Sequence, residues 1–192
     1  YIGICMGIVA CEGGNESNET PVVTAESTPS VTAKNISANL SGVEIAMRIP
    51  PGWNGRKMDN GILIAEQQGS IHNIGKLMGV QVYVFVHSIN KFPSSIRNDA
   101  HPARSILEQV VSEPTMVGNS AVSIPQAFTW DGNDAAYYLL NDTNQNVSLI
   151  VAVVLANQSQ LVAINISCPS SQADSVRKAL PDLLDDLWVN NI

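Results

Sequence analysis

The sequence predicts an α+β fold, in which one antiparallel sheet of about six to seven strands is packed between helices in an α/β/α sandwich. Three observations predict it: short segments whose apolar residues alternate with a period of two, two segments with apolar residues at helical spacing, and an order of strands, helix, antiparallel strands and helix. Apolar residues make up 45% of the 192 residues, which supports a packed core. We expect one folded domain over residues 40–192.

The first half of this domain contains three predicted strands. Residues 43–49 alternate apolar and polar side chains and end at the turn Pro50-Pro51-Gly52-Trp53. A short apolar run follows at 61–65, and residues 80–89 form the clearest strand of the chain. Valines line one side of that strand, while Gln, Tyr, Phe and His line the other, so both of its faces should contact other layers.

The second half of the domain is predicted to begin with a helix over residues 100–112, which ends before Pro114. Strands are expected over four further segments, with Pro125 at an edge or a bulge of the first of them. Asp131-Gly132 and residues 142–145 have the composition of hairpin turns. The four expected strands cover residues 121–129, 135–141, 148–156 and 160–168.

A closing helix is predicted over residues 172–188. Ser171 and Asp174 have the spacing of a capping box, and Pro181 should bend the helix. An apolar stripe on the helix should pack against the sheet. The residues of this stripe are Ala173, Val176, Leu180, Leu183, Leu184 and Leu187.

An apolar segment opens the sequence. Residues 1–11 are too short to span a bilayer and resemble the apolar part of a secretory signal peptide, cut so that the initiating Met and the positive residues are missing. Ile8-Val9-Ala10-Cys11 resembles the bacterial lipobox, and this resemblance implies that Cys11 carries acyl chains on its sulfur and its amino group. In the alternative interpretation, Cys11 is an ordinary residue at the end of an uncleaved leader.

Residues 12–39 are predicted to be a disordered tether. They are rich in Ser, Thr, Asn and Glu and contain no aromatic residue, so they cannot bury enough apolar surface to offset the entropy of ordering. Together with an acylated Cys11, the tether predicts a bacterial lipoprotein held at the extracytoplasmic face of the cell membrane.

The folded region resembles a known superfamily. The strand ending in Ile49-Pro50-Pro51-Gly52-Trp53, the helix before Pro114, the small-residue strand 119–124, an aromatic-bearing strand and the closing helix are similar to the PsbP-like fold. The resemblance covers residues 43–190. That superfamily includes the PsbP extrinsic proteins of photosystem II and many bacterial lipoproteins. The resemblance implies the fold of the domain. No motif in this sequence allows the role of PsbP in photosystem II to be transferred to this chain.

Charge and motifs exclude several classes of function. The net charge of −7 leaves no basic patch for nucleic acid. The sequence contains no nucleophile elbow, phosphate-binding loop or dinucleotide fingerprint, and it predicts neither an enzyme nor a cofactor. If Cys5 leaves with the signal peptide and Cys11 is acylated, Cys168 remains as a buried apolar residue without a disulfide partner.

Five polar residues are weak candidates for a ligand site. His87 ends a strand face that carries Tyr83 and Phe85, and its imidazole can titrate near neutral pH. Asp131 and Asp134, together with Asn133 and Asp142, offer oxygen ligands for calcium if they gather at one end of the sheet. The same residues also suit hairpin turns, and packing is the usual role of a strand histidine, so the sequence predicts no metal site.

Two functions therefore remain open from the sequence. The first is a non-enzymatic docking or accessory domain for a membrane or envelope complex, which predicts an exposed apolar or aromatic patch with Trp53 and Trp130 as candidates. The alternative is a small-ligand or metal-binding module of the envelope, which predicts a concave pocket with convergent polar groups. An envelope hydrolase is a third hypothesis that no residue pattern supports.

Overall fold

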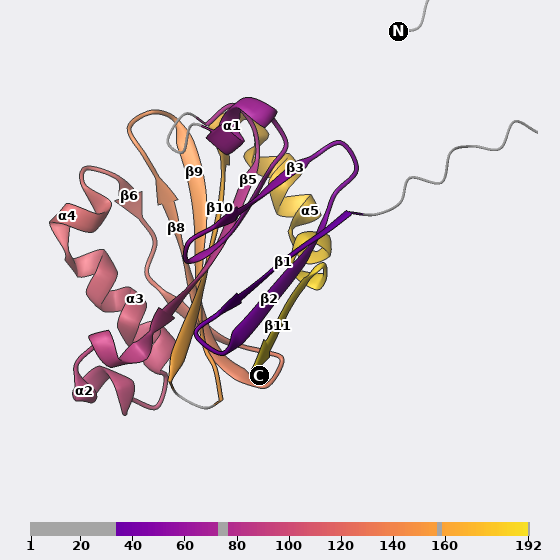
Figure 1. The fold of residues 1–192 in the computed structure, drawn as a ribbon. Coiled ribbons are helices and arrows are strands. Elements are labelled where there is room, and N and C mark those ends of the chain that lie inside the picture. The colour runs from indigo at the N-terminus through magenta and orange to yellow at the C-terminus, as the bar shows by residue number, and fades with distance from the viewer. Residues whose placement is uncertain (1–33, 73–76, 157–158, 192) are drawn as a thin grey trace, which may run out of the picture. The chain divides into compact units, whose positions relative to one another are not determined.

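The computed structural model describes residues 34–72, 77–156 and 159–191, and within them two antiparallel sheets form the fold (Figure 1). The larger sheet has eight strands, with β7 pairing β8 beside the end strand β6. In spatial order they are β3 (Asn54–Met58), β4 (Gly61–Ala65), β5 (Gln81–Ser88), β10 (Gln160–Pro169), β9 (Asn146–Val154), β8 (Asn133–Asn141) and β6 (Ala121–Val122), with β7 at Gln126–Trp130. The smaller sheet is β1 (Lys34–Leu40), β2 (Val43–Ile49) and β11 (Leu187–Asn191).

Helices and the small sheet cover the two faces of the large sheet. Helix α3 (Pro102–Ser112) packs on β8 and β9 on one face. The small sheet and helix α5 (Ala173–Asp185) pack on the other face (Figure 1). The remaining helices are short: α1 (Gln68–His72), η1 (Ile89–Lys91), α2 (Ser94–Arg97), α4 (Pro114–Val117) and η2 (Ser170–Gln172). No helix among the described residues is both long enough and apolar enough to cross a membrane.

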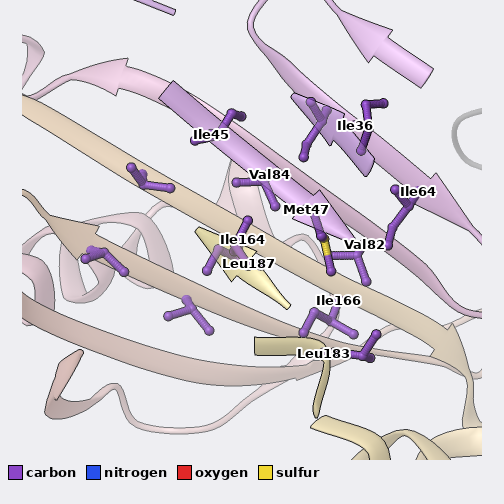
Figure 2. Packing of buried hydrophobic residues seen from close by; sticks show 14 of the residues in the cluster. Ile36, Ile45, Met47, Ile64, Val82, Val84, Ile164, Ile166, Leu183 and Leu187 are labelled. Atoms are coloured by element: carbon purple, nitrogen blue, oxygen red, sulfur yellow. The ribbon is translucent and has the colours of Figure 1, made fainter. Parts of the chain in front are cut away.

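The main core lies between the two sheets. Alternate residues of β2 point at the large sheet, and Val43, Ile45 and Met47 are almost completely buried there. Figure 2 shows Met47 in the same cluster as Val82 and Ile164 of the large sheet. The period-two pattern of these strands therefore decides which side chains form the core.

Tight turns fix the register of the hairpins. Both turn residues of Asp131-Gly132 have positive φ, +48° and +75°, as a two-residue type I′ hairpin requires. In the β8–β9 hairpin, the Asp142 carboxylate accepts hydrogen bonds from the backbone N–H groups of Asn144 and Asn146, at 2.8 and 2.9 Å. Both predicted hairpins are confirmed.

The α+β class is confirmed, and the strands expected at 43–49 and 61–65 have the predicted bounds. Pro125 divides the strand expected at 121–129 into β6 and β7, which pair with β8 on either side of a bulge. The sheets contain more strands than expected, because β1, β3 and β11 were not predicted. One face of the large sheet is covered by a second sheet in addition to a helix.

Two predicted boundaries are wrong. Residues 34–39 were expected in the tether, but they form β1, because Ile36 is buried on the main core and the strand pairs along its whole length with β2. The closing helix ends at Asp185, and Leu187 starts β11 instead of extending the helical stripe. The capping box does not form either, since Ser171 belongs to η2 and the helix begins after Gln172 without a side-chain cap.

Candidate functional site

A long cavity of about 740 Å³, here called the apolar groove, lies between α5 and the part of the large sheet that α5 leaves open. Its floor comes from β8, β9 and β10, and one wall comes from α5. Eleven of its lining side chains are apolar or aromatic: Phe128, Tyr137, Leu139, Val147, Leu149, Val151, Ile166, Cys168, Ala173, Val176 and Leu184. The polar lining residues are Asn141 and Arg177.

Strand register places the floor of the groove in rows that run across the sheet. Leu139 of β8 pairs with Leu149 of β9, which pairs with Ile166 of β10. Exposure rises along this row, from 2% at Ile166 to 41% at Leu139. Tyr137, two residues from Leu139 along β8 and on the same face, is 36% exposed. The groove is therefore closed beside α5 and open to solvent along β8.

The two ends of the groove differ in polarity. The Ser170 N–H donates to the Gln145 carbonyl oxygen at 2.8 Å, so the start of α5 and the β8–β9 hairpin lie at the same end. Asn141 ends β8 there, and Arg177 lies about 6 Å along the axis from the first residue of α5. The other end contains Phe128, whose ring lies 5.9 Å from that of Tyr137 between centroids. One end is thus polar and the other is aromatic.

The guanidinium of Arg177 remains accessible at the polar end. It contacts the Asp174 carboxylate at 3.2 Å, but both side chains are largely exposed. An exposed pair one turn apart on a helix contributes little stability, so Arg177 can exchange this partner for another anion.

Cys168 lies in the floor of the groove and is buried, as the sequence predicted. Burial raises the pKa of its thiol, so the sulfur stays protonated at neutral pH. It acts here as a small apolar surface.

The structure does not bring the candidate ligand residues together. His87 and Asp134 lie on the same face of the large sheet, but they are three strands apart. The pairing runs from His87 through Leu161 and Val154 to Asp134, which separates the backbones of His87 and Asp134 by about 14 Å. Asp131 and Asp142 lie at opposite ends of β8, in the two hairpin turns, so these residues do not gather at one end of the sheet as a calcium site would require. Within the described residues, no group of three metal-ligating side chains is present.

His87 is packed against an aromatic neighbour, and its ring centroid lies 5.0 Å from that of Phe85. Partial burial lowers the pKa of His87 below its ordinary value of 6.5, and the positive charge of Lys91 lowers it further. The folded state therefore binds fewer protons at this site than the unfolded state does.

This depressed pKa predicts a pH dependence of stability. The contribution of His87 is complete above pH 6.5 and is lost as the pH falls towards the lower folded-state pKa, because the unfolded chain then takes up the proton first. We expect the urea midpoint of the wild type to fall more between about pH 7.5 and pH 5 than that of His87→Gln. Equal pH dependence in the two proteins would contradict this assignment.

Asp134 has a structural role at the start of α3. One carboxylate oxygen accepts the Ala103 N–H at 2.7 Å, and the other lies 3.3 Å from Nδ1 of His101. A strand residue thus caps the first turn of a helix through Ala103, which lies 31 residues earlier in the chain, a role that the local sequence does not reveal.

We expect Asp134→Ala to reduce the free energy of unfolding by about 1 kcal/mol, the usual effect of removing a helix N-cap. Asp134→Asn retains an acceptor oxygen and should cost less. Urea denaturation of both variants tests this order, and an equal loss in the two would mean that the charge, and not the cap, is what stabilises α3.

Comparisons with known proteins were made at the level of families, sequences and structures. No family model matches the chain, and no curated protein matches it in sequence. The solution structure of cyanobacterial PsbP (CyanoP) from Synechocystis sp. PCC 6803 is similar, with a TM-score of 0.53 and 12% identity over 85% of this chain and 96% of that one. The crystal structure of LpqN, involved in cell envelope biogenesis of Mycobacterium tuberculosis, matches with a TM-score of 0.52 and 10% identity over 82% and 91%.

The fold is PsbP-like. The similarity of fold inferred from the order of elements is therefore confirmed. The predicted signal peptide, Cys11 and tether residues 12–33 lie outside the described residues.

Within the PsbP-like fold, the expected aromatic patch lies elsewhere than predicted. Trp53 and Trp130 are partly buried and pack against the main core. The exposed apolar side chains of the groove are Tyr137 and Leu139. A signal for them was present in the sequence, since residues 135–140 are apolar at both odd and even positions and so indicate a strand with two apolar faces.

A second cavity, of about 520 Å³, lies beside Trp53 and is lined by both halves of α5, through Ser175 and Val176 and through Asp182 and Leu183. Three of its four charged lining residues make contacts within the fold. Arg48 pairs with Asp186 at 3.3 Å, and Glu66 accepts the Val80 N–H at 3.2 Å. The apolar groove is the better candidate for an external partner, because Tyr137 and Leu139 expose apolar surface within it.

Proposed function

We propose that this chain is a non-catalytic accessory protein, held at the extracytoplasmic face of a bacterial membrane, and that it contacts its partner through the apolar groove. The exposure of Tyr137 and Leu139 within a large apolar concavity carries this proposal. A folded domain rarely leaves such a surface open unless it binds something there.

The membrane anchor in this proposal rests on the sequence. The lipobox-like residues Ile8 to Cys11 and the polar composition of residues 12–33 support acylation followed by a tether. Expression with a complete signal peptide in the presence of an alkyne-labelled fatty acid tests it. We expect labelling of the wild type and of Cys5→Ser, and none of Cys11→Ser. Labelling that persists in Cys11→Ser would contradict the anchor.

Site-specific crosslinking in native membranes tests the contact surface. A photoreactive amino acid at Leu139 should give crosslinked products, while the same amino acid at Ile124 should not. Ile124 is a matched control, because it is an exposed apolar residue, 73% accessible, that does not line the groove. Equal crosslinking from the two positions, or none from either, would contradict the proposal.

A further inference from the structure

We infer that the apolar groove binds one long-chain fatty carboxylate, with its head group at Arg177 and Asn141 and its tail directed towards Phe128. This inference rests on the proposed function and names the chemistry of the partner at the same site. It depends on the size of the groove, its polarity from end to end and the position of its positive charge.

The dimensions of the groove fit a single acyl chain. Its volume of about 740 Å³ lies within the usual range for small-molecule sites. The length of the groove can be measured along β8. Phe128 pairs with Ala135, and Ala135 is six residues from Asn141, so the two ends of the groove are about 20 Å apart. The acyl chains of one bilayer leaflet span about 15 Å, so a chain of this kind and its head group fit the groove lengthwise.

The polarity of the groove distinguishes an amphiphile from a peptide helix. The polar groups gather at the end where α5 begins, and the floor from Leu139 and Leu149 to Phe128 is apolar. An amphipathic helix exposes polar residues along its whole length, and it would be matched by polar groups along the whole rim. A fatty carboxylate has its polar atoms at one end, as the groove does.

The charge at the polar end favours an anionic head group. Arg177 presents several N–H donors in a planar fork, which suits a carboxylate, and the amide of Asn141 can donate a further hydrogen bond. Arg177 carries one positive charge and has a weakly held partner in Asp174. A fatty acid supplies one negative charge for it.

Titration with fatty carboxylates of increasing length tests whether the groove buries the acyl tail. The full 192-residue chain is titrated with decanoate, dodecanoate and tetradecanoate, each below its micellar concentration. We expect the affinity to rise about fourfold for each added methylene, as burial of that group predicts. Affinity that is independent of chain length would overturn the inference.

Two pairs of variants test the location of the site. Arg177→Gln should weaken dodecanoate binding about tenfold and leave dodecanol binding unchanged, while Lys178→Gln, the same charge change one residue further along α5, should alter neither. Leu139→Asp should weaken both ligands more than tenfold, whereas Ile124→Asp should not. Both sites are solvent-exposed, so the variants should fold, and thermal melting checks this.

Other occupants of the groove give different results. Tighter binding of a lysophospholipid than of the fatty acid of equal chain length, or a concentration-dependent dimer that excludes dodecanoate, would overturn the inference. Crosslinking of position 139 to a protein without any fatty acid binding would also overturn it, while leaving the proposed function intact. Failure of both crosslinking and fatty acid binding would remove the two proposals together.

Discussion

Replacing Gly61 by alanine is expected to reduce the free energy of unfolding by about 2–3 kcal/mol. Gly61 begins β4 and pairs with Phe85 of β5. A Cβ at this position would collide with the carbonyl oxygen of Val84 and lie 3.0 Å from Cα of Phe85. These are backbone atoms of a strand held between β4 and β10, so the collision can be relieved only by distorting the sheet.

Urea denaturation measures this loss, and Gly69→Ala provides the control. A Cβ at Gly69 would meet the sulfur of Met78 at 3.0 Å, but Met78 is an exposed and flexible side chain that can move away. We expect the control to change the unfolding free energy by less than about 0.5 kcal/mol. Equal losses in the two variants would show that the close approach at Gly61 does not determine its cost.

Replacing Leu187 by alanine is expected to cost about 3 kcal/mol. Leu187 is the first residue of β11, where it is buried in the main core and pairs with Met47 of β2 (Figure 2). Its removal leaves a cavity between the two sheets as well as losing the transfer free energy of the side chain. The loss should also loosen β11, which has only β2 as a strand neighbour.

Leu139→Ala is the matched control for this prediction, since it makes the same chemical change at a side chain that is 41% exposed. We expect it to cost less than about 1 kcal/mol in urea denaturation. Hydrogen exchange of the amides in β2 should speed up in Leu187→Ala and not in Leu139→Ala. Unchanged exchange in β2 would contradict the view that β11 holds the small sheet in place.

The parts of the fold that the sequence predicted are those with a strong local pattern. Residues 43–49 alternate so regularly that both the strand and its buried face could be predicted, and the same holds for the type I′ turn at Asp131-Gly132. One of the strands that were missed, β3, has no such pattern. Residues 54–58 form a largely exposed strand of polar composition, whose pairing with β4 depends on long-range context.

Residues 183–191 show how a helical pattern can compete with strand pairing. Leu183, Leu184 and Leu187 fit one helical stripe, so the sequence favoured a helix that continues to residue 188. In the structure, the helix stops at Asp185, because residues 187–191 pair with β2 and bury Leu187 there. This pairing depends on a strand at the other end of the domain, which a local window cannot include.

The candidate site could be predicted only in part. Residues 135–140 indicated a strand that is apolar on both faces, but the groove exists because α5 covers only part of the sheet face. That outcome depends on where the helix packs, not on the composition of the strand. Nothing in the sequence distinguishes Arg177 from the other charged residues of α5, and only the structure places it at the rim of the groove.

The small sheet gives the domain an unusually non-local topology. Strand β2 lies near the start of the described chain, and one of its two neighbours, β11, is at the end (Figure 1). High contact order of this kind slows folding, because a long loop must close before the contacts that stabilise it can form. Strand β2 therefore cannot complete its pairing in the small sheet until residues 187–191 have been synthesised.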